Sequence, residues 1–411
     1  MTIRAPLPVD CVGAPTDKGD MHKRVFDQIV IGVGGMGSAA VCELARRGQR
    51  VLGLEQFAVP HEFGSSAAST RIFRFAYFED PSYVPLMRLA FARWQRLQRD
   101  FGESFVTTTG GLDIGTASGR VVSGAKLACQ AHGLNHEVLR ASELNRRFPA
   151  WRLPNEFEAV LQPEAGFLLA DRAIVAHASV ARRLGAEVNE NEAVKRWKVI
   201  GDRVEVETER ARYEAGSLIL AAGAWTGKLW GPLKSLAVPE RQVVGWFRSD
   251  GQPFQCHNFP VFILDCPENG TFYGIPEQAV EGFKVGKFHH RCQAVDADSI
   301  DRRIGPDDVA VLAAIGRYLA RPMGAAVGFK TCMFVNSPDE HFIVDALPEH
   351  RNVVVAAGFS GHGYKFCAAI GEILADLSMH GTTPHDTALF RLSRPALGQR
   401  PAPAVAGGGE G

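Results

Sequence analysis

The sequence has no excess of charge of either sign. Its 411 residues contain 45 lysines and arginines against 45 aspartates and glutamates, so no basic surplus could neutralise a nucleic-acid backbone or an anionic membrane. Long apolar runs are also missing, because glycines or charged residues interrupt every hydrophobic stretch before the roughly 18 residues that a membrane helix needs. We therefore expect neither nucleic acid nor a membrane as a partner.

Export, disulfide and metal signals are missing as well. The first 20 residues contain proline, aspartate and glycine where a secretory signal needs an apolar core, which favours a cytoplasmic location. The eight cysteines include no CxxC pair, and in a chain without an export signal this spacing predicts reduced thiols. His289, His290 and residues 339–341 do not form a spaced set of three or four ligands, so no metal site is expected.

The sequence does contain an ordinary share of core-forming residues. Apolar residues make up 46% and charged residues 22%, the balance of a folded globular enzyme. Residues 1–24 and 398–411 are rich in proline and glycine and are expected to be flexible tails. Between these tails, three aliphatic segments each run into a glycine turn: residues 26–32, 217–223 and 352–358. Near-continuous aliphatic runs of this kind favour strands that are buried on both faces of one sheet.

The first of these segments opens a dinucleotide-binding pattern. Gly32, Gly34 and Gly37 form a GxGxxG turn between a strand and a helix expected at residues 38–47. The glycines would make the tight turn, let the backbone approach a pyrophosphate and let the helix pack on the strand. Glu55 ends the next strand, near the spacing of about 20 residues at which a carboxylate binds the ribose hydroxyls. The motif predicts an adenine dinucleotide and leaves FAD and NAD both open.

A second, partly antiparallel region is expected between the nucleotide-binding pieces. Residues 203–207 alternate apolar and polar side chains, which is typical of antiparallel strands with one wet face. No internal repeat or long linker divides the chain, so we expect the two regions to be interleaved.

Beyond the glycine turn, the chain resembles the monomeric sarcosine oxidase family of flavin-dependent oxidases of N-methyl and cyclic amino acids. The resemblance runs from about Phe26 to Leu397 and is most specific in residues 330–345 (KTCMFVNSPDEHFIVD) and 356–366 (AAGFSGHGYKF). Residues 64–74 are similar to the family's loop after the acidic strand. The resemblance implies an α/β fold, in which a Rossmann-like FAD-binding domain with a mixed sheet is interleaved with an α+β substrate domain built on an antiparallel sheet.

The resemblance also implies where the domains lie and which residues bind FAD. The FAD-binding domain would comprise residues 25–105, 160–235 and 328–397, and the substrate domain residues 106–159 and 236–327. Cys332 would carry FAD through a thioether to the 8-methyl carbon, a task that suits a nucleophilic thiolate. The other implied FAD-binding residues are Gly32, Gly34, Gly37, Glu55, Ser65, Arg71, Val194, Gly223, Gly358, Gly361, Gly363 and Lys365.

Four side chains are implied in catalysis by the same resemblance. Arg74 and Lys365 would hold the substrate carboxylate, a task that suits the planar donor fork of a guanidinium. Lys284 would promote the reaction of reduced flavin with oxygen, because a nearby ammonium stabilises the charge of superoxide. Tyr273 matches an active-site tyrosine of the family. A helix that begins after Gly363 would bring positive partial charge beside the flavin.

Three departures from the family pattern bear on the substrate. Residues 66–69 read SAAS where sarcosine oxidases commonly show HHGD, Phe334 replaces a frequent tyrosine, and Phe288 takes the place of a histidine. These exchanges either favour an amine larger or more hydrophobic than sarcosine or are neutral neighbours of the site. The sequence therefore predicts a monomeric, FAD-dependent oxidase that converts a secondary amino acid to an imine and O₂ to H₂O₂.

Two alternatives stay open at this point. A flavin-dependent amine dehydrogenase would pass electrons to a partner protein or a quinone in place of oxygen. A nicotinamide-dependent dehydrogenase could use the same glycine turn, but it leaves Cys332 and residues 358–365 unexplained.

Overall fold

Three aliphatic segments that are far apart in the sequence lie side by side as parallel strands. In the computed structural model, β1 (Arg24–Ile31) pairs with β12 (Arg212–Leu220), and β12 pairs with β19 (Val353–Ala357). β19 is buried along its whole length, as is usual for a parallel strand that is covered on both faces. The prediction that these segments meet in one sheet is confirmed.

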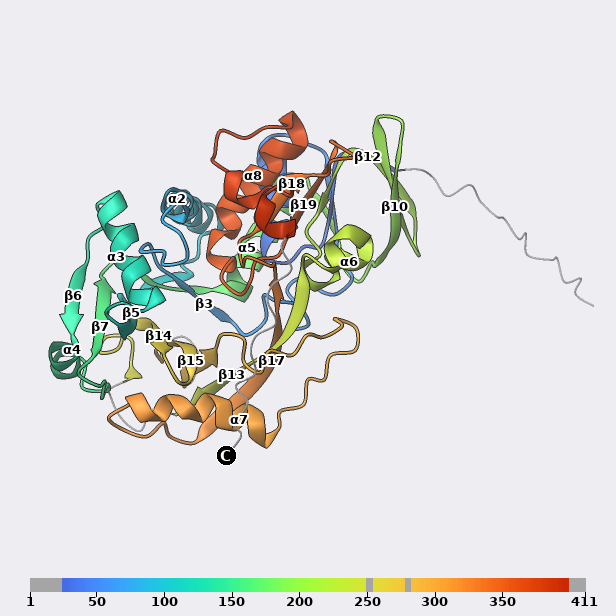
Figure 1. The fold of residues 1–411 in the computed structure, drawn as a ribbon. Coiled ribbons are helices and arrows are strands. Elements are labelled where there is room, and N and C mark those ends of the chain that lie inside the picture. Colours follow the sequence, from blue (N-terminus) through green and yellow to red (C-terminus); the bar gives the residue numbers. More distant parts are fainter. Residues whose placement is uncertain (1–23, 249–253, 278–281, 399–411) are drawn as a thin grey trace, which may run out of the picture.

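The described part of the chain, residues 24–248, 254–277 and 282–398, forms two eight-stranded sheets and one three-stranded sheet (Figure 1). In the first sheet the order is β10-β11-β12-β1-β2-β9, and β19 and β18 extend it beside β12. The strands not yet named are β2 (Val51–Leu54), β9 (Glu187–Asn189), β10 (Val194–Ile200), β11 (Arg203–Thr208) and β18 (Ile343–Ala346). Because β10, β11 and β18 are antiparallel to their neighbours, the predicted mixed sheet is confirmed.

The segment predicted to have one wet face is β11 of this first sheet. It is antiparallel to both of its neighbours, as expected. Its polar face is less exposed than predicted, because Glu205 is buried and pairs with Lys198 at 2.9 Å.

Small residues let the helices above the first sheet pack closely. α1 (Gly35–Arg46) contacts both α8 (Cys367–His380) and α5 (Ala170–Arg183). Where α1 meets α8, a side chain at Gly371 would come within 2.6 Å of the Ala39 backbone. α1 begins within the glycine turn itself, earlier than predicted, so its N-terminus faces the end of β1 directly.

The second sheet lies below the first in Figure 1 and is antiparallel except where β14 pairs with β5. Its order is β17-β13-β16-β15-β14-β5-β7-β6. The strands are β5 (Gly111–Thr116), β6 (Glu137–Arg140), β7 (Phe157–Gln162), β13 (Val238–Phe247), β14 (Val261–Cys266), β15 (Gly270–Ile275), β16 (Phe283–Lys287) and β17 (Ala326–Asn336). α7 (Pro306–Ala313) packs against β13 and β16, and α3 (Arg120–His132) packs against β5 and β7.

A three-stranded sheet, with the order β3-β8-β4, carries the segment that follows the glycine-rich loop. Its strands are β3 (Thr70–Phe73), β4 (Val106–Thr108) and β8 (Gly166–Leu169). β3 contacts β15 of the second sheet and the short helix η5 (Tyr364–Phe366), so the chain around it lies between the two large sheets. The remaining helices are α2 (Tyr83–Phe101), α4 (Ala141–Arg147), α6 (Thr226–Leu229), η1 (Gly223–Trp225), η2 (Gly231–Lys234), η4 (Ala314–Tyr318), η6 (Ala388–Phe390) and η7 (Pro395–Gly398). Among the helices of these described ranges, none is long and apolar enough to cross a membrane.

β17 belongs to both halves of the molecule. It pairs with β13 along its whole length, from Asn336 opposite Val238 to Ala326 opposite Phe247. Met333 and Val335 nevertheless lie in the hydrophobic core around the first sheet. The boundary expected at residue 328 assigns this strand to the FAD-binding domain, whereas its hydrogen bonds join it to the second sheet. The division into domains stays a prediction.

Candidate active site

The turn after β1 is shaped by two glycines that tolerate no side chain. Gly32 has a φ of +89°, and a Cβ there would lie 2.6 Å from the Ala221 carbonyl oxygen. At Gly37 a Cβ would lie only 1.7 Å from the Gly32 carbonyl oxygen, so this glycine lets α1 pack on the turn. Gly34 differs, because a Cβ there would meet only the Ser66 hydroxyl, at 3.9 Å. The turn therefore leaves backbone open at Gly34.

Glu55 lies at the carboxyl end of β2, beside this turn. Its carboxylate accepts hydrogen bonds from the Val33 backbone N–H at 2.8 Å and from the Phe57 N–H at 3.1 Å. Burial raises the pKa of this acid above its ordinary value. The two N–H groups fix the carboxylate in the position that the motif predicted.

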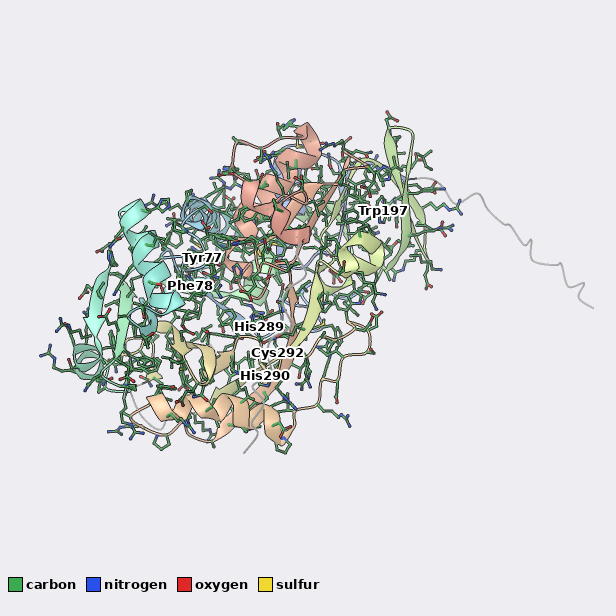
Figure 2. All side chains as sticks on the ribbon, viewed as in Figure 1. Tyr77, Phe78, Trp197, His289, His290 and Cys292 are labelled. Atoms are coloured by element: carbon green, nitrogen blue, oxygen red, sulfur yellow. The ribbon has the colours of Figure 1, made fainter. Side chains whose placement is uncertain are left out.

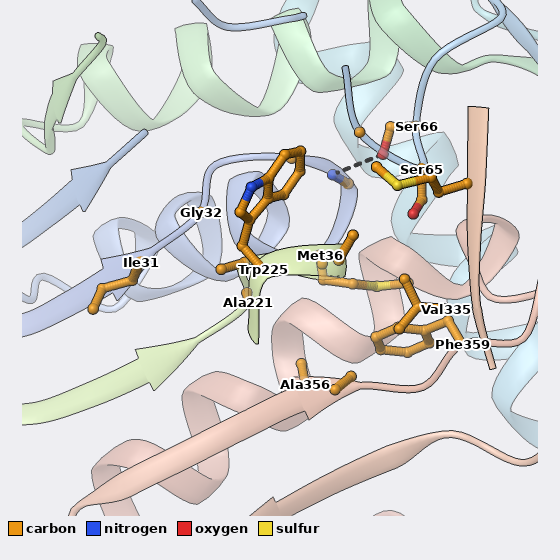
Figure 3. A pocket seen from close by; sticks show the side chains of 18 of the residues that line it. Ile31, Gly32, Met36, Ser65, Ser66, Ala221, Trp225, Val335, Ala356 and Phe359 are labelled. Carbon is orange, nitrogen blue, oxygen red and sulfur yellow. Dashed lines mark hydrogen bonds between the residues drawn. The ribbon is translucent and has the colours of Figure 1, made fainter. Parts of the chain in front are cut away.

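A cavity of about 370 Å³ opens over the turn (Figure 3). Gly35 N–H donates to the Ser66 hydroxyl across its wall at 3.3 Å, and Trp225 and Met36 project toward it. Ten residues predicted to bind FAD line this cavity: Gly32, Gly34, Glu55, Ser65, Arg71, Val194, Gly223, Gly358, Gly361 and Gly363. Open glycine backbone at a helix N-terminus, with an acid at the next strand, fits the pyrophosphate and ribose of an adenine dinucleotide.

A smaller cavity of about 60 Å³ adjoins the first one. Four residues line both cavities, namely Arg71, Phe334, Gly361 and Tyr364. The second cavity brings together the residues predicted for catalysis and attachment: Arg74, Tyr273, Lys284, Cys332 and Lys365. Of the predicted residues, only Gly37 lines neither cavity, because it lies behind the turn.

Cys332 lies in the middle of β17, opposite Gln242 of β13. It is 3% exposed and lines the second cavity, whereas its neighbour Met333 lines the first. Burial raises the pKa of the thiol, and the nearby charges of Arg71 and Lys284 act in the opposite direction. The thiol therefore lies at the wall of the second cavity, near the basic side chains of Arg71 and Lys284.

Arg71 ties the loop after Gly64 to the cavity wall. Its guanidinium donates to the backbone carbonyls of Ser65, Ala67 and Thr70. It also lies 5.7 Å from the ring centroid of Tyr364. The loop and the start of η5 are thus held together where the two cavities meet.

Arg74 is buried and already has a carboxylate partner. Its Nη2 lies 2.6 Å from both carboxylate oxygens of Glu79, and its Nη1 donates to the Ala76 carbonyl at 3.0 Å. The rings of Tyr77 and Phe78 (Figure 2) have their centroids 4.3 and 4.2 Å from the guanidinium carbon. Burial alone would raise the pKa of Glu79, but the charge of Arg74 lowers it below its ordinary value.

Lys365 lies in η5, just before α8, so the helix after Gly363 begins with a short 3-10 turn. Its Nζ donates to the His362 carbonyl at 2.8 Å and lies 5.3 Å from the Tyr77 ring centroid. Burial, and then the like charge of Arg74, lower the pKa of Lys365 to about 7. The second predicted carboxylate-binding cation therefore titrates close to neutral pH.

Lys284 points inward from β16 and is 3% exposed. Its Nζ donates to the carbonyls of Ala68 and Thr70 at 2.7 and 2.9 Å and to the Thr70 hydroxyl at 3.2 Å. Three acceptors suit an ammonium, but burial and the charge of Arg71 lower the pKa of this amine well below its ordinary value. These three acceptors hold the Lys284 amine firmly at the wall of the second cavity.

Aromatic rings line one wall of the second cavity. The ring centroids of Tyr273 and Phe288 are 5.2 Å apart, and those of Phe288 and Phe334 are 5.9 Å apart. Burial raises the pKa of Tyr273, so its hydroxyl stays protonated. The wall is apolar at Phe288 and Phe334, two of the three places where the sequence departs from the family pattern.

The histidines and cysteines outside the cavities have structural surroundings. His289 contacts Glu240 and Glu340, and His290 contacts Asp308 at 3.1 Å. No group of three or more candidate metal ligands occurs within residues 24–248, 254–277 and 282–398. The seven cysteines of this part of the chain are free thiols, and Cys11 lies outside it.

Sequence reasoning missed the side chains that hold the predicted residues in place. Glu79 partners Arg74, Thr70 accepts from Lys284, and the Gln162 amide oxygen accepts from the backbone N–H groups of Phe75 and Ala76. The only available signal for Glu79 was an acid directly after the largely aromatic residues 75–78. Thr70 and Gln162 belong to strands whose pairing the sequence did not specify.

Comparisons with known proteins agree with this geometry. The family model described as FAD dependent oxidoreductase matches residues 27–377. Monomeric sarcosine oxidase of Streptomyces avermitilis is 39% identical over 375 residues, which cover 89% of this chain and 96% of the relative. N-methyl-L-tryptophan oxidase of Yersinia pestis is 32% identical over 372 residues, which cover 90% of this chain and 99% of the relative.

Solved structures share the fold at lower identity. NikD, an unusual amino acid oxidase essential for nikkomycin biosynthesis, superimposes with a TM-score of 0.78 at 24% identity, over 90% of this chain and 98% of the other. Glycine oxidase from Geobacillus kaustophilus gives a TM-score of 0.74 at 20% identity, over 90% of this chain and 99% of the other.

Proposed function

Because the chain belongs to the family of FAD dependent oxidoreductases, we propose that it oxidises a secondary amino acid, N-methylated or cyclic, at its carbon–nitrogen bond. One observation carries the proposal: a glycine-lined cavity of dinucleotide type adjoins a smaller cavity whose lining includes the buried basic side chains of Arg74, Lys284 and Lys365. FAD, when bound, supplies a two-electron acceptor that oxygen can reoxidise. The names of the relatives, sarcosine oxidase and N-methyl-L-tryptophan oxidase, support this class of substrate.

The proposed reaction removes two electrons and two protons from the C–H and N–H groups of the substrate. The organic product is an imine, which water hydrolyses to a carbonyl compound and an amine. Oxygen takes up the two electrons and two protons and becomes H₂O₂. The amine must enter in its neutral form, because its lone pair becomes part of the new C=N bond.

Arg74 and Lys365 are proposed to bind the substrate carboxylate. Both line the second cavity, and Glu79 already neutralises part of the charge of Arg74. A carboxylate entering the cavity would share the guanidinium with Glu79 and gain a second contact from Lys365. Charge-assisted hydrogen bonds of this kind are stronger than neutral ones and would orient the amine toward the cavity junction.

Lys284 is proposed to promote the reaction with oxygen. Backbone carbonyls of Ala68 and Thr70 hold its Nζ at the wall of the cavity that contains Cys332. The two carbonyls and the Thr70 hydroxyl are three acceptors around Nζ, and they favour the protonated form of this amine. The resulting ammonium would stabilise superoxide in a site that excludes water.

Cys332 is proposed to bond FAD through a thioether to the 8-methyl carbon. Forming this bond removes the thiol proton and one methyl hydrogen, and the two electrons released reduce O₂ to H₂O₂. Burial raises the pKa of this thiol, and the nearby basic groups of Arg71 and Lys284 act in the opposite direction, toward the thiolate that the reaction needs.

The substrate is proposed to carry a larger or more hydrophobic side chain than sarcosine. Phe288 and Phe334 contribute apolar surface to the second cavity, together with Ile72, Val244, Ile263 and Ile275. Such a wall favours apolar side chains and offers them no specific donor. A monomeric state and a cytoplasmic location are proposed as well; the name of the relative monomeric sarcosine oxidase supports the former.

The attachment of FAD is tested with Cys332→Ala. We expect acid precipitation of the wild-type protein to leave the flavin absorbance with the pellet, and precipitation of the variant to release it. Cys367→Ala is the matched control, because Cys367 is also buried and lines the first cavity. Release of flavin from the wild-type protein would contradict the covalent bond while leaving FAD binding intact.

The reaction is tested by measuring peroxide with sarcosine, N-methyltryptophan, N-methylalanine, pipecolate and proline. We expect faster turnover of the bulkier substrates than of sarcosine, with one H₂O₂ formed for each O₂ consumed. Slow turnover in air that accelerates with an artificial electron acceptor would instead favour a dehydrogenase.

A further inference from the structure

A carboxyl group is buried inside the second sheet next to the proposed substrate site. Asp113 lies in the middle of β5, between Val160 of β7 and Ile263 of β14, and is 1% exposed. Its Oδ2 accepts a hydrogen bond from the Gln162 amide at 2.7 Å, whereas Oδ1 has no hydrogen-bond partner. Because an unsatisfied buried carboxyl is costly, its presence at this position needs an explanation.

Gln162 continues the connection from Asp113 toward Arg74. Its Oε1 accepts from the backbone N–H groups of Phe75 and Ala76, at 2.9 and 2.5 Å. Two N–H donors require the oxygen on that side, so the amide nitrogen must face Asp113. The orientation of the amide is therefore fixed by its partners at both ends.

The connection ends at the guanidinium. Arg74 Nη1 donates to the carbonyl of Ala76, whose N–H is held by Gln162. The Nε of Arg74 lies 4.0 Å from Asp113 Oδ1, the oxygen without a hydrogen bond. Asp113 thus approaches Arg74 directly through Oδ1 and holds its backbone segment indirectly through Oδ2.

Arg74 needs such support because the segment around it has little regular structure. Residues 74–79 follow the end of β3 and form no helix or strand. The Glu79 carboxylate on this same segment holds only Nη2, so it does not fix the segment relative to the sheet. Asp113 and Gln162, in contrast, belong to paired strands of the second sheet.

We propose that Asp113 and Gln162 are positioning residues for Arg74, and that they fix residues 74–76 so that the guanidinium faces the substrate carboxylate. The proposal rests on the proposed function, because it assumes that Arg74 binds that carboxylate. The two residues act through Arg74 and do not line the second cavity themselves.

The test compares Asp113→Val, Gln162→Met and Asp113→Asn in the flavin-loaded protein. The first two remove the hydrogen bond between the residues, whereas an asparagine keeps an oxygen that accepts from Gln162. We expect the Kd of acetate and the KM of the best amino acid to rise about tenfold in the first two variants, with kcat changed less than about twofold. In Asp113→Asn, the Kd of acetate and the KM of the best amino acid should both stay near the wild-type values at pH 6.

Leu112→Ala is the matched control for general damage to β5. Leu112 precedes Asp113 on the same strand, is equally buried and faces the hydrophobic core on the other side. We expect this variant to melt at a lower temperature with unchanged Kd and KM. If Asp113→Val does not fold, Gln162→Met carries the test alone, since it leaves β5 unaltered.

The outcomes separate this inference from the proposed function. Equal Kd and KM values in the wild-type protein and in Gln162→Met would overturn the inference, as would an Asp113→Asn variant as impaired as Asp113→Val. Arg74→Gln tests the assumption that Arg74 binds the substrate carboxylate, on which both the inference and the proposed function rest. If that variant keeps the wild-type Kd for acetate, the assignment of the carboxylate site itself is wrong.

Discussion

At the scale of single residues, the two basic groups proposed to bind the substrate carboxylate lie beside two acidic ones. Arg74 and Lys365 supply the basic groups, and Glu79 and Asp113 supply two buried carboxyls. Burial and the charge of Arg74 lower the pKa of Lys365 to about 7, and burial raises the pKa of Asp113 to about 7. The net charge that an incoming carboxylate meets therefore changes near neutral pH.

This balance predicts how carboxylate binding depends on pH. As the pH rises through about 7, Lys365 loses its positive charge and Asp113 gains a negative one, so acetate should bind the flavin-loaded protein more weakly. The loss should not exceed about tenfold per pH unit for each group. In Lys365→Met we expect weaker binding at pH 6 and a flatter profile, measured by titrating the flavin absorbance from pH 6 to 9.

The control for this titration is Lys287→Met. Lys287 ends the same strand that carries Lys284, but it does not line either cavity. Its replacement should leave the profile unchanged. A profile in Lys365→Met identical to that of the wild-type protein would contradict the role of Lys365.

Individual site residues were predictable where a motif fixed them in the sequence. The glycine turn and Glu55 follow one another within a single βαβ unit, so local spacing was sufficient to find them. Glu79 and Asp113 were not predictable, because their importance arises from contacts with Arg74 that form only when β5 and the loop after β3 come together. A charged residue in a strand gives no sign in the sequence that it is buried.

At the scale of elements, the glycine turn separates a packing role from a binding role. Gly37→Ala should destabilise the fold by about 1–3 kcal/mol or more, because its Cβ would collide with the Gly32 carbonyl. Gly34→Ala should fold normally, because its Cβ meets no atom closer than 3.9 Å, but the methyl group would occupy the open backbone where a pyrophosphate binds. Circular dichroism during heating and the flavin content per chain measure the two effects.

Gly231→Ala serves as the control for these substitutions. Gly231 starts η2, has no atom within 4 Å of an added Cβ and lies outside both cavities. Both its melting and its flavin content should equal those of the wild-type protein. Full flavin content in Gly34→Ala after brief exposure to limiting FAD would show that the cofactor does not approach the turn.

The fold was predictable to the extent that hydrophobic runs reveal strands. β19 and the carboxyl-terminal ends of β1 and β12 are aliphatic runs, and their burial follows from that pattern. The extent of β17 was not predictable, because the strand pairs in one sheet while part of it packs in the core of the other. Residues 203–207 gave the correct antiparallel strand but an incorrect exposure, since an ion pair covers Glu205.

At the scale of the whole molecule, an imidazole bridges the two halves. His289 (Figure 2) contacts Glu240 of β13 through Nδ1 at 3.1 Å and Glu340, in the connection from β17 to β18, through Nε2 at 2.9 Å. Hydrogen bonds to the two acids raise the pKa of His289 to about 10. The hydrogen bond from His289 lowers the pKa of Glu340 to about 2.

The bridge predicts a pH-dependent contribution to stability. Since the folded-state pKa of His289 lies above its ordinary value of 6.5, the stabilisation is complete below pH 6.5 and is lost as the pH rises through about 10. His289→Asn keeps a residue that tolerates the φ of 54° found here. Because the bridge is about one-third exposed, we expect the variant to lose about 1 kcal/mol or less at pH 6.5, measured by urea unfolding.

The same experiment at pH 10 provides the check. The difference between the wild-type protein and His289→Asn should shrink toward zero there. A difference that stays constant from pH 6.5 to 10 would mean that the imidazole acts through packing alone.

The position of Cys332 on a strand shared by both halves has a consequence for how the protein acquires its prosthetic group. The glycine turn would govern the first, reversible capture of FAD, whereas a bond at β17 would make retention independent of that capture. Variants of the glycine turn would then differ in the rate at which they acquire covalently bound FAD and not in their final flavin content. The flavin content of a purified sample would therefore depend on the FAD concentration to which the protein was exposed before isolation, and on the length of that exposure.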